Sequence, residues 1–187
     1  KLLKKNEIFL CDSGGQYKFG TTDVTRTICF NNQNKKIKNI FTNVLKGHIA
    51  VVKTDLNKKK TGKLIDIEAR KFLKKDGLNY NHGTGHGVGF FLNVHEGPQA
   101  ISKQNSVKIQ SGMILSNEPG YYKQGKFGIR IENLVYACKV GRNLIFKNLT
   151  LAPIEKDLIN YNLLTKKERD YIFEYHLEVY SKLSPYL

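Results

Sequence analysis

The chain has 187 residues, a hydrophobic fraction of 40% and a formal net charge of +15. This length and composition allow one globular domain with its own core and exclude a globally disordered protein. No run of 18 apolar residues is present, and no apolar stretch follows the N-terminal charges, so we expect neither a transmembrane helix nor a signal peptide. Three cysteines without metal-type spacing argue against a disulfide framework and favour a reducing, cytoplasmic compartment.

The positive charge is carried mostly by scattered lysines, and only five of the basic residues are arginines. Sequence-specific binding of nucleic acids favours the forked guanidinium of arginine for phosphates and bases. We therefore interpret the charge as a solvated basic surface and expect no nucleic-acid partner.

The N-terminal half begins with a predicted hairpin. Residues 8–13 predict a short strand, a glycine-rich turn follows, and residues 23–30 predict a second strand with β-branched side chains. Cys11 in the first strand is interpreted as a core residue. Apolar side chains at helical spacing then predict a helix over residues 35–53. His48 lies on that apolar stripe, so we interpret it as a packed core histidine rather than a ligand.

The remaining elements are predicted from the spacing of apolar residues, from glycines at element ends and from capping residues. They are a helix over residues 64–75 that ends at Gly77, strands over residues 113–117 and 128–138 joined through residues 120–125, a strand near 144–151, and a final helix that a Thr165–Glu168 capping box opens and that runs to about Leu183.

Four carboxylates and one imidazole in short, glycine- or proline-containing segments indicate a dinuclear metal site. These side chains belong to Asp12, Asp23, His86, Glu118 and Glu132. This donor set suits a pair of manganese, cobalt, iron or zinc ions better than a single structural zinc. Two ions about 3.5–4 Å apart that share a hydroxide stabilise a tetrahedral intermediate, so the site predicts a hydrolase. His82 and His95 are candidates for stabilising an oxyanion or transferring a proton.

Other interpretations explain less of the pattern. Each acid alone could be a turn residue or a surface charge, but Glu132 lies between Ile131 and Leu134 in an apolar strand, where an unpaired carboxylate is costly. The chain has no Gly-x-Ser-x-Gly motif of a serine hydrolase. The glycine-rich segment 83–89 lacks the Lys-Ser/Thr of a phosphate-binding loop.

The sequence also contains a weak internal echo. Asp12 to Asp23 and Glu118 to Glu132 each place two acids across a predicted hairpin whose loop carries Gly, Tyr and Lys. This pattern suggests a pseudo-twofold site in which each hairpin donates two carboxylates.

Motifs over about residues 8–180 resemble the aminopeptidase P (Xaa-Pro aminopeptidase) family of the pita-bread peptidases. The segments that carry the resemblance are 10–17, 20–27, 82–89, 94–98 and 116–122 continued by 127–133. The resemblance implies an α+β pita-bread fold, in which helices cover a pseudo-twofold antiparallel sheet. Residues 1–151 would form the catalytic domain and residues 152–187 a C-terminal extension with a terminal helix. The family's N-terminal domains, and a histidine that precedes its first metal-binding Asp, have no counterpart in this chain.

The resemblance assigns a role to each metal ligand. Asp12 and Asp23 would hold one ion, with Asp23 bidentate and Asp12 bridging to the second ion. His86 and Glu118 would be direct ligands of the pair, and Glu132 would bridge both ions.

The resemblance also implies roles around the metals. Glu118 would act as general base for the bound water, His95 would assist at the scissile peptide, and His82 would line the substrate pocket. Arg130 would lie on the same strand face as Glu132 and support it.

The implied function is a manganese-dependent aminopeptidase that removes an N-terminal residue preceding proline. The resemblance further implies a cytoplasmic homodimer without a membrane partner. Two alternatives stay open: a prolidase, which cleaves Xaa-Pro dipeptides only, and an inactive pita-bread protein that serves as a binding module.

Overall fold

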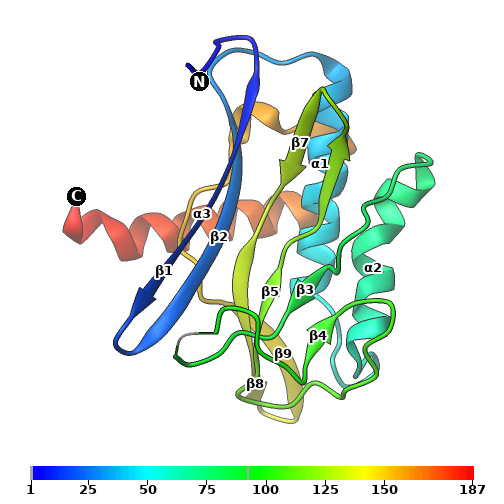
Figure 1. Ribbon diagram of the computed structural model, residues 1–187, viewed down its shortest axis with the longest axis vertical. Coiled ribbons are helices and arrows are strands. Elements are labelled where there is room, and N and C mark those ends of the chain that lie inside the picture. The colour runs from blue at the N-terminus through cyan, green and yellow to red at the C-terminus, as the bar shows by residue number, and fades with distance from the viewer. Residues whose placement is uncertain (1, 92) are drawn as a thin grey trace.

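A computed structural model describes residues 2–91 and 93–187 of the chain. The elements are β1 (Ile8–Tyr17), β2 (Gly20–Cys29), α1 (Lys35–Val52), α2 (Gly62–Lys75), β3 (Gly85–His86), β4 (Ala100–Ile101), β5 (Ile114–Asn117), β6 (Gly120–Lys123), β7 (Phe127–Arg130), β8 (Asn133–Val140), β9 (Asn143–Asn148) and α3 (Lys166–Leu183), with short 3-10 turns around α3. The fold is thus α+β, and antiparallel strands lie on one side of α1 and α2 (Figure 1).

The strands form small antiparallel ladders. β1 pairs with β2, β3 with β4, and β6 with β7, and the ladder with most strands has the order β5-β8-β9. A glycine-rich turn was predicted after residue 13, but the structure continues both strands through the glycines to a tight connection at Lys18–Phe19. That prediction was wrong because glycines also occur where strand backbones approach closely: a Cβ on Gly14 would lie 2.8 Å from the Thr22 carbonyl oxygen.

A second difference concerns the predicted strand over residues 128–138. The structure divides it into β7 and β8, and β6 and β7 form their own hairpin between β5 and β8. The break falls at residues 131–132, the position of a predicted metal ligand. The interpretation of Cys11 as core is also wrong, because its residue is exposed.

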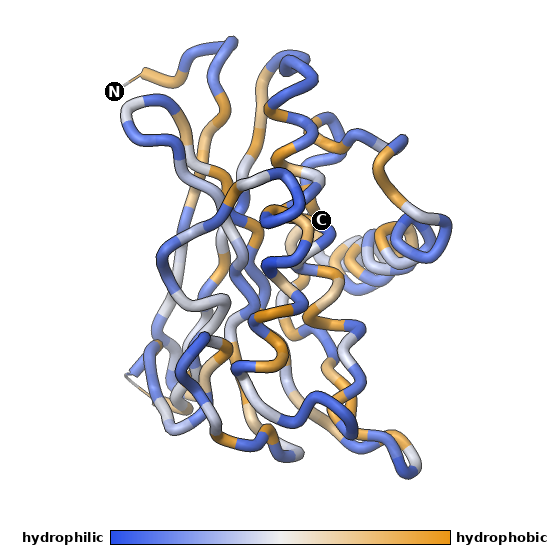
Figure 2. Tube along the Cα trace, turned by 90° about the vertical axis from the view of Figure 1, so that its right-hand side faces the viewer, coloured by the Kyte–Doolittle hydropathy of each residue, from blue (hydrophilic) through white to orange (hydrophobic). Residues whose placement is uncertain are grey.

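The helices agree closely with their sequence signals. Asn34 caps α1, the Thr165–Glu168 capping box opens α3, and Gly77 follows α2 with a φ of +70°. Hydrophobic and hydrophilic residues alternate along the helices (Figure 2), and their apolar faces pack into one core with the strands. Among the described residues, no helix is long and apolar enough to cross a membrane.

A half-buried arginine joins the C-terminal region to the sheet. The Arg26 guanidinium donates hydrogen bonds to the carbonyl oxygens of Ala152 and Pro153, at 2.7 and 2.8 Å, and to the carbonyl oxygen of Glu132. The Tyr175 hydroxyl on α3 donates to the same Ala152 oxygen at 2.7 Å. α3 is therefore tied to the strands through one guanidinium rather than only through apolar packing.

Candidate metal centre

The five side chains predicted as metal ligands line one cavity of about 450 Å³. Asp12 comes from β1, Asp23 from β2 and His86 from β3. Glu118 follows β5, and Glu132 lies in the break between β7 and β8. Five segments that are far apart in the sequence thus bring their side chains to one place.

Strand register explains how the two aspartates meet. Asp12 pairs with Thr25 and Asp23 pairs with Gly14 in the β1–β2 ladder. Residues 12 and 14 share a face of β1, so the two aspartates are diagonal neighbours on one face of the hairpin. They lie within the ladder, not beside its turn.

Register also brings the two glutamates together. Asn117 pairs with Asn133 at one end of the β5–β8 ladder. Glu118 comes directly after Asn117, and Glu132 directly before Asn133, so both leave the end of the same ladder. The second carboxylate pair is therefore presented by a ladder end rather than across a simple hairpin.

The polar atoms of the cavity lie close together. His86 Nε2 is 3.3 Å from Asp23 Oδ2 and 3.4 Å from Glu118 Oε1. Single ligand atoms of Asp23, His86 and Glu132 lie within 4.8 Å of one another. The Ser116 hydroxyl donates to Glu118 Oε1 at 3.0 Å and accepts from the His86 backbone N–H at 2.9 Å. Ser116 therefore fixes a carboxylate oxygen relative to the imidazole.

Glu132 provides the test of whether a cation fits. Its residue is 2% exposed, and its Oε2 accepts a hydrogen bond from the Thr25 hydroxyl at 2.6 Å. Among the described residues, no lysine or arginine forms an ion pair with it. Burial, followed by the negative charges of Glu118, Asp23 and Asp12, raises the pKa of Glu132 to about 7. Because buried carboxylates without countercharge are unfavourable, these donors fit divalent cations.

Protonation in this cavity is coupled to the same charges. Burial raises the pKa of Glu118 despite the attraction of His86 and a hydrogen bond from Ser116. Burial acts to lower the pKa of His86, but hydrogen bonds to Asp23 and to the backbone of Gly87 raise it above its usual value. A bound cation would take the place of the proton that these groups otherwise share.

A hydrogen-bond network extends from the cavity to its rim. Arg130 Nη2 contacts Asp12 Oδ2, its Nη1 donates to the Tyr122 hydroxyl at 2.9 Å, and its Nε donates to Thr25 Oγ1 at 2.9 Å. His82 Nε2 lies 2.9 Å from the same Tyr122 hydroxyl. The Arg130 guanidinium therefore links Asp12 of the hairpin to His82 through the Tyr122 hydroxyl.

The sequence placed Arg130 and Glu132 on one face of one strand, and that placement is wrong. β7 ends at Arg130, and Glu132 lies beyond it in the break before β8. The hydrogen bonds connect the two residues only through Thr25, whose hydroxyl contacts both.

The two other predicted histidines lie at different positions around the cavity. His95 lines it directly, and its ring packs edge-on against His86 with ring centroids 4.0 Å apart. His82 lies beside Glu118, with its Nδ1 4.0 Å from Glu118 Oε2. Burial is the main cause that lowers the pKa of His82, so its imidazole favours the neutral form.

Sequence reasoning missed three side chains of this site: Thr25, Ser116 and Tyr122. Two had a usable signal: Thr25 lies two residues after Asp23 on the same face of β2, and Ser116 lies two residues before Glu118. Tyr122 had no comparable signal, because its partners His82 and Arg130 lie in other segments of the chain.

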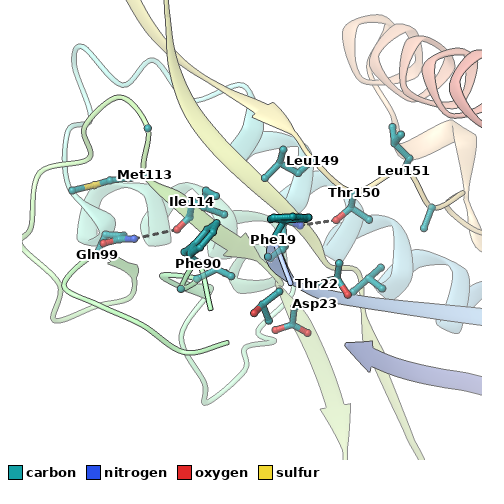
Figure 3. A pocket seen from close by; sticks show the side chains of 18 of the residues that line it. Phe19, Thr22, Asp23, Phe90, Gln99, Met113, Ile114, Leu149, Thr150 and Leu151 are labelled. Carbon is teal, nitrogen blue, oxygen red and sulfur yellow. Dashed lines mark hydrogen bonds between the residues drawn. The ribbon is translucent and has the colours of Figure 1, made fainter. Parts of the chain in front are cut away.

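An apolar hollow of about 1010 Å³ adjoins the metal cavity. Phe19 and Phe90 line it, as do Met113 and Leu149 (Figure 3). The two cavities share Asp23 and the two threonines before it as wall residues. Space for an apolar group therefore lies next to a candidate metal ligand.

Models of known families match both parts of the chain. Metallopeptidase family M24 matches residues 1–138, and the C-terminal region of peptidase M24 matches residues 142–187. A probable Xaa-Pro aminopeptidase P of Laccaria bicolor is 48% identical over 197 aligned positions, which cover 100% of this chain and 31% of that protein. An uncharacterized peptidase of Schizosaccharomyces pombe is 49% identical, with 100% and 33% covered. The chain thus spans about a third of the length of these relatives.

Solved structures agree with this assignment. An X-prolyl aminopeptidase from Caenorhabditis elegans, described as a cytosolic enzyme with a di-nuclear active site, superposes with a TM-score of 0.91 at 39% identity and covers 98% of this chain and 31% of that one. A prolidase from Pyrococcus furiosus superposes with a TM-score of 0.71 at 31% identity over 80% of this chain and 43% of its own. The pita-bread fold and the dinuclear peptidase site expected from the motifs are therefore those of its relatives, and the chain belongs to metallopeptidase family M24.

Proposed function

We propose that this chain forms the catalytic domain of a metallo-aminopeptidase that releases the N-terminal residue from peptides with proline in the second position. The observation that carries the proposal is the convergence of four carboxylates and one imidazole in one cavity. The name of the Laccaria bicolor relative, and the di-nuclear site ascribed to the Caenorhabditis elegans enzyme, support it.

Five side chains would hold the two ions. Asp12 and Asp23 would hold one ion, and His86, Glu118 and Glu132 would complete the ligand set of the pair. When bound, two divalent ions supply an activated water and polarise the scissile carbonyl. The prevalence of carboxylate oxygens, with one imidazole, supports manganese as the metal.

Side chains beside the ligands would handle protons and charge. We assign Glu118 as general base, since burial raises its pKa and its Oε2 faces His82. His95 lies against the His86 ring, where it would stabilise charge that develops on the scissile carbonyl oxygen. His82 would contact the substrate from the rim, oriented by its contact with Tyr122. Arg130 would hold Asp12 in place.

Compartment and assembly are further parts of the proposal. A cytoplasmic location is supported by the cytosolic relative from Caenorhabditis elegans and by three free cysteines. A homodimer is supported by an exposed apolar stripe on α3, formed by Phe173, Leu177 and Tyr180. We propose the basic surface as solvated rather than as a nucleic-acid site.

The test uses the complete gene product, purified and loaded with Mn²⁺. Ala-Pro-Ala, Ala-Ala-Ala and the dipeptide Ala-Pro are compared by following free alanine with mass spectrometry. We expect cleavage of Ala-Pro-Ala and much slower cleavage of Ala-Ala-Ala. Absence of tripeptide cleavage, with both ions bound, would refute the proposal.

Prolidase is the second candidate, because prolidases are among the structures that superpose on this chain. Cleavage of Ala-Pro with no release from Ala-Pro-Ala would favour it. An inactive binding module is distinguished by metal analysis: a purified protein that binds none of manganese, cobalt, iron or zinc near stoichiometry would support that alternative.

A further inference from the structure

His48 is a fully buried histidine on α1 that takes no part in the metal cavity. Its Nδ1 lies 3.2 Å from the backbone oxygen of Asn117, and the Asn117 side-chain amide donates in return to the His48 carbonyl oxygen at 3.0 Å. Two hydrogen bonds in opposite directions thus join residues 69 positions apart.

The state of the ring follows from its surroundings. Burial lowers the pKa of His48 to about 3, with the charge of Arg26 acting in the same direction, so the imidazole is neutral near pH 7. A contact between Nδ1 and a carbonyl oxygen requires a proton on Nδ1. The ring is therefore the Nδ1–H tautomer, and Nε2 carries the lone pair.

The ring lies beside the segment that carries Glu118. Its hydrogen bond reaches the backbone of Asn117, which directly precedes Glu118. The Ile131 N–H donates to the carbonyl oxygen of Pro119 at 3.4 Å, so this segment also contacts the residue that precedes Glu132. His48 thus contacts the Glu118 segment directly and is connected to the Glu132 segment through it.

Core stability does not account for a histidine here. Among the described residues, His48 Nε2 and Asn117 Oδ1 are buried without a hydrogen-bond partner. Leaving such atoms unpaired costs stability, and an apolar side chain at position 48 would remove the unpaired Nε2. The imidazole therefore fixes the position of Asn117, although its unpaired Nε2 lowers the stability of the fold.

We propose that His48 is a positioning residue for the metal centre: by fixing the backbone at Asn117, next to Glu118, it sets the separation of Glu118 and Glu132. The inference rests on the proposed metal site, although His48 itself touches neither the metal nor the substrate. Residues that orient metal ligands from behind typically contribute about 10–100-fold to metal affinity.

The test replaces His48 in the complete gene product and titrates Mn²⁺ into the metal-free protein by calorimetry. We expect His48→Leu to weaken at least one of the two binding steps about 10–100-fold. His48→Asn places an amide donor close to the position of Nδ1 and should recover most of that loss. Val44→Ala is the matched control, because Val44 is also fully buried and lies one turn earlier on α1. It should lower the melting temperature without changing Mn²⁺ affinity.

Unchanged Mn²⁺ affinity in His48→Leu, with a lower melting temperature as in Val44→Ala, would overturn the proposal and leave His48 a core residue. If His48→Leu does not fold, His48→Asn is compared with His48→Gln, whose donor reaches the region of Nε2 instead. Equal Mn²⁺ affinities in these two variants would also overturn it. Metal binding is measured without substrate, so failure of the peptidase proposal, seen as wild-type protein that binds metal but cleaves no peptide, stays distinguishable.

Discussion

The metal centre is built from two unlike halves. The hairpin half presents Asp12 and Asp23 from a two-stranded ladder, and the Asp12 side chain is 49% exposed. The core half presents Glu118 and Glu132 from the end of the β5–β8 ladder, and Glu132 is 2% exposed. Arg130 restrains Asp12 in the hairpin half, whereas Thr25 and Ser116 restrain the glutamates of the core half.

This difference in burial should separate the effects of the ligands on metal binding from their effects on folding. Asp12, the exposed ligand of the hairpin, loses little solvation without metal, so its substitution should change metal binding more than folding. Glu132, the buried ligand of the core, places a carboxylate where charge is unfavourable, so it should destabilise the metal-free protein. We therefore expect folding and metal binding to be coupled mainly through the core half.

The largest expected effect concerns the core half and catalysis. Glu118→Gln keeps an oxygen that can contact a cation but removes the proposed base, so kcat for Ala-Pro-Ala should fall by about 10²–10⁴-fold while some metal stays bound. Steady-state kinetics and elemental analysis measure the two effects. Glu178→Gln, at an exposed position of α3, is the control and should change neither. An undiminished kcat in Glu118→Gln would show that Glu118 of the core half is not the general base.

A second prediction tests the cost of the buried carboxylate. The pKa of Glu132 is raised to about 7 in the folded, metal-free protein, above the ordinary value of 4.5. Its contribution to stability is therefore fully present below about pH 4.5 and is lost as the pH rises through 7. The loss is on the order of 3 kcal/mol. Metal-free Glu132→Gln should thus gain stability relative to wild type between pH 5 and pH 8, as measured by urea denaturation.

Bound metal should reverse that trend, since a cation favours the ionised carboxylate. Adding Mn²⁺ should therefore stabilise the wild-type protein more at pH 8 than at pH 5. A stability difference between wild type and Glu132→Gln that does not change with pH would show that the two halves differ less than their burial suggests.

A third prediction concerns the link between the halves. Thr25→Val removes the hydroxyl that contacts both Glu132 and Arg130, and leaves a buried carboxylate oxygen with one partner fewer. We expect the free energy of unfolding to fall by about 1–3 kcal/mol and Mn²⁺ affinity to fall with it. Thr54→Val is the control, because its buried hydroxyl donates to the Ala50 carbonyl oxygen at 2.7 Å and lies outside the metal cavity. An equal loss of Mn²⁺ affinity in the two variants would show that the Thr25 hydroxyl does not link the halves.

The two halves were also unequally predictable from sequence. Five candidate ligands were predicted, because each stands in a short motif whose residue types suit metal binding, and the structure brings them to one cavity. The hairpin half was placed wrongly in detail, since Gly14 and Gly15 indicate a turn locally but lie inside a ladder. That outcome depends on pairing with the opposite strand, which local propensity does not contain.

The surroundings of the core half were missed for a different reason. The His48–Asn117 contact joins residues 69 positions apart, and the Arg130–Asp12 contact joins residues 118 positions apart. Helices were predicted well because their signals are local: apolar spacing for α1 and a capping box for α3. Candidate ligands can thus be found from motifs, whereas the side chains that orient them require the tertiary structure.

The smallest expected effect lies at the rim. Tyr122→Phe removes a hydroxyl that contacts His82 and accepts a hydrogen bond from Arg130, at a residue that is 39% exposed. Water can replace that partner, so the free energy of unfolding should change by less than about 1 kcal/mol, while kcat/KM for Ala-Pro-Ala falls about tenfold as His82 loses its orientation. Tyr121→Phe is the matched control on the same strand, because the Tyr121 hydroxyl makes no hydrogen bond within the described part of the chain. If Tyr122→Phe lost as much stability as Thr25→Val, the Tyr122 hydrogen bonds would support the fold as strongly as those of the core half. Within this network, only Asp12 would then belong to the hairpin half.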